Sequence, residues 1–365
     1  MGNASEEPKR PGASQSGFGD RVVAWQRKHG RHDLPWQNTR DAYRIWLSEI
    51  MLQQTQVSAV IGYYERFLSR FPDLAALARA PEDDVLASWA GLGYYARARN
   101  LHRAARIVVE QHGGVFPSDH ASVRALPGIG RSTASAICAF AYGSRTAILD
   151  GNVKRVLARH FGVEGFPGER RVEQRLWSLS ERLVPDRDIE AYTQGLMDLG
   201  ARVCARSAPA CQACPLAATC VARREQRTNQ LPAPRPAKVL PQRETTMLVL
   251  WRQGAVLLEK RPAPGIWGGL WCFPELGEAG IEQECLARFA VTLDSTTRLG
   301  NIEHGFTHFR LRIKPVLAHA RNAPSLEQPG RLWLTPADAL GAAIPVPVRR
   351  ILQALDRTLL VQSGV

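Results

Sequence analysis

Four of the seven cysteines in this 365-residue chain lie within a short stretch, at Cys204, Cys211, Cys214 and Cys220. Their spacing is C-x6-C-x2-C-x5-C, so one loop could wrap a single metal centre. Disulfides would be reduced in the cytoplasm, and four thiols this close therefore indicate a metal ligand set. Four thiolates suit either zinc or an iron-sulfur cluster, and the spacing leaves both open. The other cysteines sit in apolar runs and are expected to be buried packing residues: Cys138, Cys272 and Cys285.

A glycine-rich turn and an acidic residue form a second group. Gly128 and Gly130 lie in Leu-Pro-Gly-Ile-Gly between helical segments, and Asp150 follows 20 residues after the second glycine. Glycine amides can approach a phosphate without obstruction, although such a turn alone is more often only a turn. Asp150 opens a further helix, where its ordinary use is as the N-cap. A carboxylate at the positive end of a helix stays ionised, as the stabilisation of a sugar cation requires.

A second carboxyl group lies in an apolar helical segment. Glu49 is flanked by large apolar side chains in Trp-Leu-Ser-Glu-Ile-Met-Leu-Gln-Gln-Thr-Gln, residues 46–56. Desolvation there would raise its pKa. Glu49, Gln53 and Gln56 also share one helical face, which equally fits a solvated polar stripe. Two carboxyl groups with separated pKa values can protonate a leaving group and stabilise the cation that remains.

The hairpin, Asp150 and the cysteine loop together resemble the helix-hairpin-helix DNA glycosylases related to endonuclease III, over residues 20–225. In that superfamily the cysteine quartet holds a [4Fe-4S] cluster, so the resemblance implies iron rather than zinc. Members that also cut the DNA backbone carry a catalytic lysine two residues after the second hairpin glycine. This chain has Ser132 there, and lyase activity is expected to be weak or absent.

Residues 46–57 and the run Gly-Leu-Gly-Tyr-Tyr-Ala-Arg-Ala-Arg-Asn at 91–100 are similar to the signature of MutY-family adenine DNA glycosylases. The resemblance implies that protonated Glu49 donates to N7 of adenine and that ionised Asp150 stabilises or traps the sugar cation. It also implies that Asn152 forms hydrogen bonds in the catalytic site. Lys154 would react only adventitiously with the opened sugar. Some members have a tyrosine where this chain has Ser132.

The same resemblance assigns residues that hold DNA and the extruded base. Each has a packing or surface alternative. An adenine pocket is expected at Arg31, Leu34, Trp36 and Gln194. Gln54 and Tyr94 are expected to act as wedges in the base stack, because a base must leave the duplex to be reached. Further DNA contacts are expected at Gly128, Gly130, Ser132, Lys154, Arg202 and Arg206.

The C-terminal part contains Trp-Gly-Gly-Leu-Trp-Cys-Phe-Pro at 267–274, which resembles the start of a Nudix hydrolase domain. The acidic metal-binding helix of that family does not follow, since the chain reads Gly-Ile-Glu-Gln-Glu-Cys-Leu-Ala at 280–287. Hydrolase activity is therefore not expected. MutY-family enzymes use such a domain to recognise 8-oxoguanine through Phe-Ser-His, and Phe306, Thr307 and His308 match this motif with a threonine at its centre. These residues could also simply alternate across the end of a strand.

Helical spacing of apolar residues from about 40 to 220 predicts an all-α domain. This domain would position Glu49, the glycine hairpin, Asp150 and the cysteine quartet. Its first long helix would begin near Asp41 and bury Trp46, Ile50, Val57, Ile61, Tyr64 and Leu68. The expected order is a disordered tail (1–19), the helix-hairpin-helix domain (20–225, with the iron-sulfur loop at 204–220), a linker (226–244) and an α/β Nudix-like domain (245–360). In the last, strands are predicted at 246–250, 255–260 and about 309–317, and a helix near 281–289.

The charge balance favours a polyanionic partner, because 47 Lys and Arg residues against 34 Asp and Glu leave a net charge of +13. No stretch is long and apolar enough for a membrane helix, and we expect a cytoplasmic monomer. The function expected is removal of adenine mispaired with 8-oxoguanine or guanine in double-stranded DNA. A pyrimidine-specific glycosylase with lyase activity and a non-catalytic DNA-binding protein are the alternatives. Ser132 and the C-terminal domain argue against the first, and the Glu49 and Asp150 pair against the second.

Overall fold

The computed structural model describes residues 17–236, 239–263, 265–277, 280–322 and 328–362. The chain forms two compact units that are not continuous in sequence: unit 1 contains Met1–Tyr64 and Ile107–Ala237, and unit 2 contains Glu65–Arg106 and Lys238–Val365. Residues 1–16 of the predicted tail lie outside the described residues. Helix α1 begins at Phe18, whose ring is fully buried. The end of that tail is therefore part of the folded unit.

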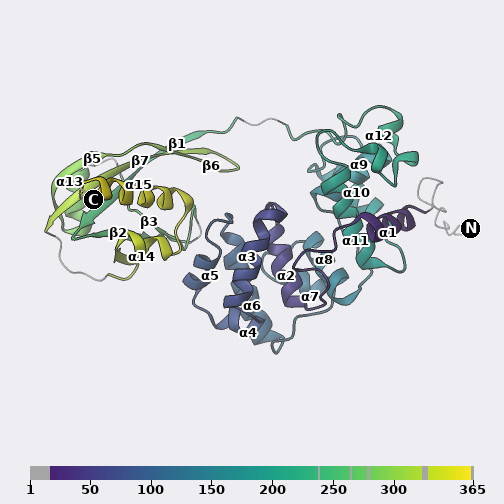
Figure 1. Cartoon of the computed structure of the whole chain (residues 1–365), viewed down its shortest axis with the longest axis horizontal. Helices are drawn as coiled ribbons and strands as arrows, with labels where there is room; N and C mark the ends of the chain where they lie inside the picture. Colours follow the sequence, from purple (N-terminus) through teal and green to yellow (C-terminus); the bar gives the residue numbers. More distant parts are fainter. Residues whose placement is uncertain (1–16, 237–238, 264, 278–279, 323–327, 363–365) are drawn as a thin grey trace, which may run out of the picture. The chain divides into compact units, whose positions relative to one another are not determined.

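The described residues of unit 1 form helices and loops, which confirms the all-α prediction (Figure 1). Its helices are α1 (Phe18–His29), α2 (Ala42–Leu52), α7 (His120–Ala125), α8 (Arg131–Tyr142), α9 (Gly151–Phe161), α10 (Arg170–Leu183), α11 (Ile189–Asp198) and α12 (Val221–Arg224). A π-helix at Leu199–Val203 and 3-10 turns at Cys211–Ala213 and Ala217–Thr219 form the cysteine region. Helices α3 (Val57–Arg70) and α6 (Ala96–Gln111) cross the boundary between the units.

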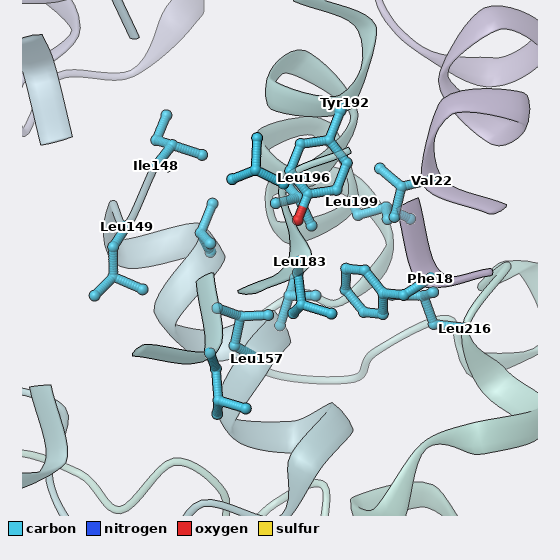
Figure 2. Packing of buried hydrophobic residues seen from close by; sticks show 14 of the residues in the cluster. Phe18, Val22, Ile148, Leu149, Leu157, Leu183, Tyr192, Leu196, Leu199 and Leu216 are labelled. Atoms are coloured by element: carbon cyan, nitrogen blue, oxygen red, sulfur yellow. The ribbon is translucent and has the colours of Figure 1, made fainter. Parts of the chain in front are cut away.

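One apolar core joins helices α1, α8, α9, α10 and α11 to the cysteine loop. Phe18 of α1, Tyr192 of α11 and Leu216 of the cysteine loop belong to one buried cluster, which also receives side chains from α9 and α10 (Figure 2). Ile148 and Leu149, directly before Asp150, are members of it and only 2% and 3% exposed. The chain that carries the expected catalytic aspartate is thus anchored in the core.

The predicted first long helix is wrong, because it is two helices with a break at residues 53–56. Asp41 caps α2 as expected, accepting hydrogen bonds from the amides of Tyr43 and Arg44 at 2.9 and 3.3 Å. The helix ends at Leu52, and Gln54 has a positive φ of 57°. A left-handed residue cannot continue a right-handed helix. The break shifts the helical phase, so the buried side chains of α3 include Val60 and Phe67, whereas Leu68 is partly exposed.

Unit 2 combines helices with one mixed sheet, which confirms the α/β prediction for the C-terminal part. From 65–106 it takes the rest of α3, α4 (Leu74–Arg79), α5 (Glu82–Ser88) and most of α6. The sheet order is β3-β2-β1-β7-β5, with β4 beside β1, β6 beside β7 and β8 beside β2. The strands are β1 (Gln242–Arg252), β2 (Ala255–Lys260), β3 (Trp271–Cys272), β4 (Glu275–Leu276), β5 (Thr292–Arg298), β6 (Ile302–Gly305), β7 (Arg310–Asn322) and β8 (Arg331–Leu334). Strands β1 and β7 pair in parallel, and the other pairs are antiparallel.

Central strand β1 is covered on both faces. Its residues Met247–Leu250 are all buried, whereas a strand with one solvated face would alternate. Leu248 and Leu250 pack with Cys285 and Phe289 of α13 (Ile281–Phe289). Helices α14 (Pro336–Gly341) and α15 (Val346–Gln362) complete the unit (Figure 1). Cys138, Cys272 and Cys285 are fully buried, as predicted.

Both ends of the predicted linker belong to ordered structure. Its first part packs on unit 1, where the Leu231 carbonyl accepts a hydrogen bond from Arg159 Nε at 2.8 Å and the Leu231 side chain is buried. At the other end, β1 already begins at Gln242. The segment between the units is therefore shorter than 226–244. Among the described residues, no helix combines the length and apolar character needed to cross a membrane.

Candidate active site

A cavity of about 530 Å³ in unit 1 brings together most of the predicted catalytic and base-binding residues. Its size suits a small organic ligand. Helices α2, α8, α9 and α11 and the loop between α1 and α2 all contribute to its walls. The predicted residues that line it are Arg31, Leu34, Trp36, Glu49, Gln54, Ser132, Asp150, Asn152 and Gln194. Residues from widely separated parts of the sequence therefore meet at one site.

Glu49 is partly accessible in this cavity but has mainly apolar neighbours along α2. Ile45, Trp46 and Ile50 are all buried. The pKa of Glu49 rises from 4.5 to about 8, first because burial desolvates the carboxylate and second because Asp150 is negatively charged. A carboxyl group with this pKa is mostly protonated at neutral pH. This is the protonation state that the predicted role of Glu49 as a proton donor requires.

Asp150 is the N-cap of α9, and its carboxylate accepts two hydrogen bonds. Its Oδ1 accepts from the Val153 amide at 2.7 Å, and its Oδ2 accepts from Asn152 Nδ2 at 3.2 Å. The pKa of Asp150 is raised because burial desolvates the carboxylate, while these hydrogen bonds and the charge of Arg155 act in the opposite direction. The capping role and the catalytic role do not exclude each other. The capping hydrogen bond holds in place the carboxylate that the expected catalytic role would need.

Arg155 connects this aspartate to the cysteine region. Its Nη2 donates to Asn152 Oδ1 at 2.9 Å and to the Gly200 carbonyl at 2.5 Å, and its Nε donates to the Cys204 carbonyl at 2.7 Å. Gly200 lies so close to Asn152 that an added Cβ would be 2.4 Å from the Asn152 Cβ. Neither Arg155 nor Gly200 was predicted as a site residue. Their contacts join residues about 50 positions apart, which no local pattern reveals.

Asp198 organises the expected base pocket. It is a fully buried carboxylate that no sequence motif marked as a site residue. Arg31 donates to it from its backbone amide at 2.8 Å and from Nε at 2.7 Å. Gln194 Nε2 donates to the same carboxylate at 2.9 Å. Trp36 is buried edge-on against Tyr64, with ring centroids 5.4 Å apart, so it combines packing with lining the cavity.

The glycine hairpin joins α7 to α8 beside the cavity. Gly128 has a φ of 81°, which only glycine adopts easily, and a Cβ on Gly130 would meet nothing within 4 Å. The Gly130 backbone is therefore open to approach. Gln53 Nε2 donates to the Gly128 carbonyl at 3.4 Å and links the hairpin to the end of α2.

The other predicted DNA contacts lie outside the cavity lining. The ammonium group of Lys154 is paired with Glu173 of α10 at 2.5 Å. Arg202 Nη1 donates to the His29 carbonyl at 3.1 Å, and Arg206 follows the first cysteine. Tyr94, in unit 2, is 47% exposed and has a positive φ of 48°. The two predicted wedges, Gln54 and Tyr94, thus share a strained left-handed backbone, a feature that is uncommon away from glycine and often marks functional positions.

The four cysteines of the quartet line one small cavity, together with Arg159. The Arg159 side chain is buried and donates to the carbonyls of Ala205 and Arg206 at 2.7 and 3.1 Å. Its Nη1 also lies 3.4 Å from Cys204 Sγ. Among the described residues, no group of three or more His, Cys, Asp or Glu side chains converges as the ligands of one metal ion would.

The predicted recognition motif forms the tight turn between β6 and β7 in unit 2. The Phe306 amide donates to the Phe309 carbonyl at 2.9 Å, and Thr307 and His308 are exposed at the tip. These residues lie in a turn and not on alternate faces of a strand, as the simpler interpretation had it. Phe306 stacks on Phe309 at 4.5 Å and contacts His304 at 4.7 Å and Trp267 at 5.6 Å. Sequence reasoning missed His304 and Trp267.

Two family models match the chain. One, described as HhH-GPD superfamily base excision DNA repair protein, covers residues 47–182, and a NUDIX domain model covers 245–354. A solved thermostable thymine-DNA glycosylase is similar in structure, with a TM-score of 0.54 at 29% identity, over 58% of this chain and 97% of that one. The fold and the paired carboxyl groups thus define a base-excision DNA glycosylase of the helix-hairpin-helix class.

Relatives that match this chain over more of its length show which family of DNA glycosylases it belongs to. The adenine DNA glycosylase of Buchnera aphidicola (subsp. Acyrthosiphon pisum) is 34% identical over 344 residues, which span 94% of this chain and 98% of the relative. The human adenine DNA glycosylase is 33% identical over 405 residues, which span 93% and 74% of the two chains. This chain belongs to the adenine DNA glycosylase family. The predicted family, fold class and enzyme class are confirmed.

Proposed function

We propose that this enzyme removes adenine mispaired with 8-oxoguanine, and less readily adenine opposite guanine, from double-stranded DNA. It acts as a monomer and a monofunctional glycosylase, leaving an abasic site. The observation that carries the proposal is the placement of Glu49, with its pKa raised to about 8, in the same cavity as the capped carboxylate of Asp150. This pairing of an acid with an anion is the arrangement that cleavage of a glycosidic bond requires.

The proposed reaction begins with adenine extruded into the cavity. Protonated Glu49 donates to N7, and the bond between C1′ and N9 breaks with its electron pair going to adenine. The sugar is left with positive charge at C1′, and the Asp150 carboxylate stabilises it or bonds to it. Water then adds to C1′ and releases one proton, which restores the acid. Gln194 is proposed to recognise the base edge.

Single-turnover cleavage of a duplex containing adenine opposite 8-oxoguanine tests the two carboxyl groups. Glu49→Gln and Asp150→Asn are each expected to slow base removal by at least about 100-fold, the scale of a lost general acid or charge partner. Glu169→Gln, an exposed residue before α10 with no capping hydrogen bond, is the matched control. Full activity in both Glu49→Gln and Asp150→Asn would reject the proposed mechanism.

The cysteine quartet is proposed to hold a [4Fe-4S] cluster. The support is that the four cysteines line one cavity, because four thiolates at one site are a ligand set that such a cluster uses. When bound, such a cluster would act as a covalent brace between segments of the loop at 204–220. Elemental analysis tests the assignment, with iron and labile sulfide expected in equal amounts and stoichiometric zinc contradicting it.

Recognition of the opposite base is proposed for the β6–β7 turn. 8-Oxoguanine differs from guanine by an N7–H donor and an O8 acceptor. Thr307 and His308 provide a hydroxyl and an imidazole at an exposed tip, supported by the ring of Phe306. Threonine keeps the hydroxyl of the serine that the family motif carries.

Absence of lyase activity is proposed from the residue that follows the hairpin. Ser132 replaces the catalytic lysine of the lyase-active members, and Lys154 is engaged by Glu173. Borohydride reduction during turnover should trap little covalent complex. Stoichiometric trapping would favour the alternative of a glycosylase with lyase activity.

A further inference from the structure

The residues before Asp150 are held by two serine side chains from two different helices. Residues 143–150 connect α8 to α9 without regular secondary structure. Ser132 Oγ of α8 accepts a hydrogen bond from the Leu149 amide at 3.2 Å. Ser180 Oγ of α10 donates to the Ile148 carbonyl at 2.7 Å. The backbone just before the catalytic carboxylate is therefore held by both of its polar groups, the Ile148 carbonyl and the Leu149 amide.

Burial makes both hydrogen bonds costly to lose. Ile148 and Leu149 are 2% and 3% exposed, and Ser180 is fully buried. A buried peptide group deprived of its partner keeps the full penalty of desolvation, so the segment would shift to find another. Both hydrogen bonds hold the peptide group that joins Ile148 to Leu149, one residue before Asp150. Any shift there changes the direction in which the carboxylate enters the cavity.

The hydrogen bond from the Leu149 amide suggests that Ser132 does more than stand in place of the lysine of lyase-active members. Its hydroxyl lies in the lining of the cavity and at the same time accepts from the backbone next to Asp150. An alanine there would remove the acceptor, while a threonine would keep it. Because Ser132 is only partly buried and lines the cavity, we expect the methyl group that threonine adds to be tolerated.

The geometry points to Ser132 and Ser180 as positioning residues that hold the Asp150 carboxylate against the developing sugar cation. This inference rests on the proposed catalytic role of Asp150. Neither serine needs to touch the adenine or the sugar. The pair sets the backbone of residues 148–149, and Asp150 is then directed by its own capping bond to the Val153 amide.

The test compares Ser132→Ala, Ser132→Thr and Ser180→Ala in the full-length protein. We expect each alanine variant to lower the single-turnover rate roughly 10- to 100-fold, as a displacement of about 1 Å at a reacting group does. The dissociation constant for a duplex with a stable abasic-site analogue should change little for Ser180→Ala, because Ser180 is not among the residues that line the cavity. Ser132→Thr should restore the rate. Amide hydrogen exchange at Leu149 should accelerate in Ser132→Ala and return to normal in Ser132→Thr.

Two further serines separate positioning from loss of stability. Ser135→Ala removes a buried hydroxyl of α8 that contacts His120 Nε2 at 3.1 Å, and Ser178→Ala removes a surface hydroxyl of α10. Both controls should excise adenine at the wild-type rate even if Ser135→Ala lowers the melting temperature. If Ser180→Ala does not fold, the comparison of Ser132→Ala, Ser132→Thr and Ser135→Ala still tests whether the Ser132 hydroxyl positions Asp150.

The outcomes distinguish this inference from the proposed function. Wild-type rates in Ser132→Ala together with an inactive Asp150→Asn would overturn the positioning role and leave the mechanism intact. An active Asp150→Asn would remove the basis of both. A slow Ser132→Ala that Ser132→Thr does not rescue would also reject the role of the hydroxyl group.

Discussion

At the scale of single residues, the neighbours of the two carboxyl groups decide which of them holds a proton. Glu49 has apolar neighbours along α2, whereas Asp150 accepts two hydrogen bonds at the start of α9. The groups share one cavity, so the charge on Asp150 raises the pKa of Glu49. Because the Asp150 carboxylate accepts two hydrogen bonds and its charge raises the pKa of Glu49, we expect Asp150 to lose its proton first as the pH rises and Glu49 second.

This order predicts the pH dependence of base removal. The proposed mechanism needs Glu49 in its protonated form, so the single-turnover rate should fall as the pH rises through about 8, the pKa of Glu49. It should also fall at acidic pH, where Asp150 becomes protonated. Rates measured under saturating enzyme from acidic to alkaline pH check this profile. A rate that stayed constant from neutral pH to well above the pKa of Glu49 would contradict the assignment of Glu49 as the acid.

At the scale of elements, α9 links the catalytic carboxylate to the cysteine loop. The Cys204 carbonyl, Arg155, Asn152 and Asp150 form one continuous series of hydrogen bonds. Arg159, one turn further along α9, binds the same loop but has no contact with Asn152 among its hydrogen bonds in the described structure. The helix therefore carries two arginines with separable tasks.

The two arginines should give different defects when changed. Arg155→Gln is expected to lower the excision rate at least about tenfold, since Asn152 loses the donor that orients it toward Asp150. Arg159→Gln should chiefly weaken the cysteine loop and lower the retained iron content. Rate measurements normalised to iron content compare the variants. Equal rates per iron-loaded enzyme for Arg155→Gln and wild type would refute the proposed link.

The β6–β7 turn is expected to affect choice of substrate more than chemistry, because it lies in unit 2 and the carboxyl groups lie in unit 1. Thr307→Ala and His308→Ala should reduce the preference for 8-oxoguanine over guanine opposite the adenine by about 5- to 100-fold, the usual worth of a polar contact in recognition. Excision opposite guanine should be nearly unchanged. Parallel assays on the two duplexes measure the ratio, and an equal loss on both would argue against recognition by this turn.

Sequence patterns predicted the regular elements well where local spacing determines them. The helix at 281–289, the hairpin strands on either side of Gln253-Gly254 and the cap at Asp41 are all present. The break between α2 and α3 at residues 53–56 was not predicted. No residue type in this run of glutamines indicates that Gln54 adopts a left-handed backbone. Asp198 and Arg155 were missed for another reason. Their roles depend on long-range contacts, such as Arg31 with Asp198, that only the folded chain creates.

At the scale of the whole molecule, the excess of basic residues matters for how DNA is bound. A net charge of +13 favours binding to DNA whatever its base sequence. Such binding releases counterions, so it is sensitive to salt. We expect affinity for an undamaged duplex to fall at least about tenfold between roughly 50 and 200 mM salt. Fluorescence anisotropy at several salt concentrations gives the slope. A flat dependence would show that phosphate contacts contribute little to binding.

The buried carboxylate of Asp198 has a consequence for which purine the pocket can accept. A carboxylate can only accept hydrogen bonds, so it fixes the Gln194 amide with its nitrogen toward Asp198. The amide oxygen is then the end available to the cavity. A 6-amino purine such as adenine offers that oxygen a donor, whereas a 6-oxo purine such as hypoxanthine or guanine would set one carbonyl against another. In the proposed base pocket, Asp198 would thus let Gln194 discriminate between purines by their exocyclic group at C6, although Asp198 itself lies away from the bond that breaks.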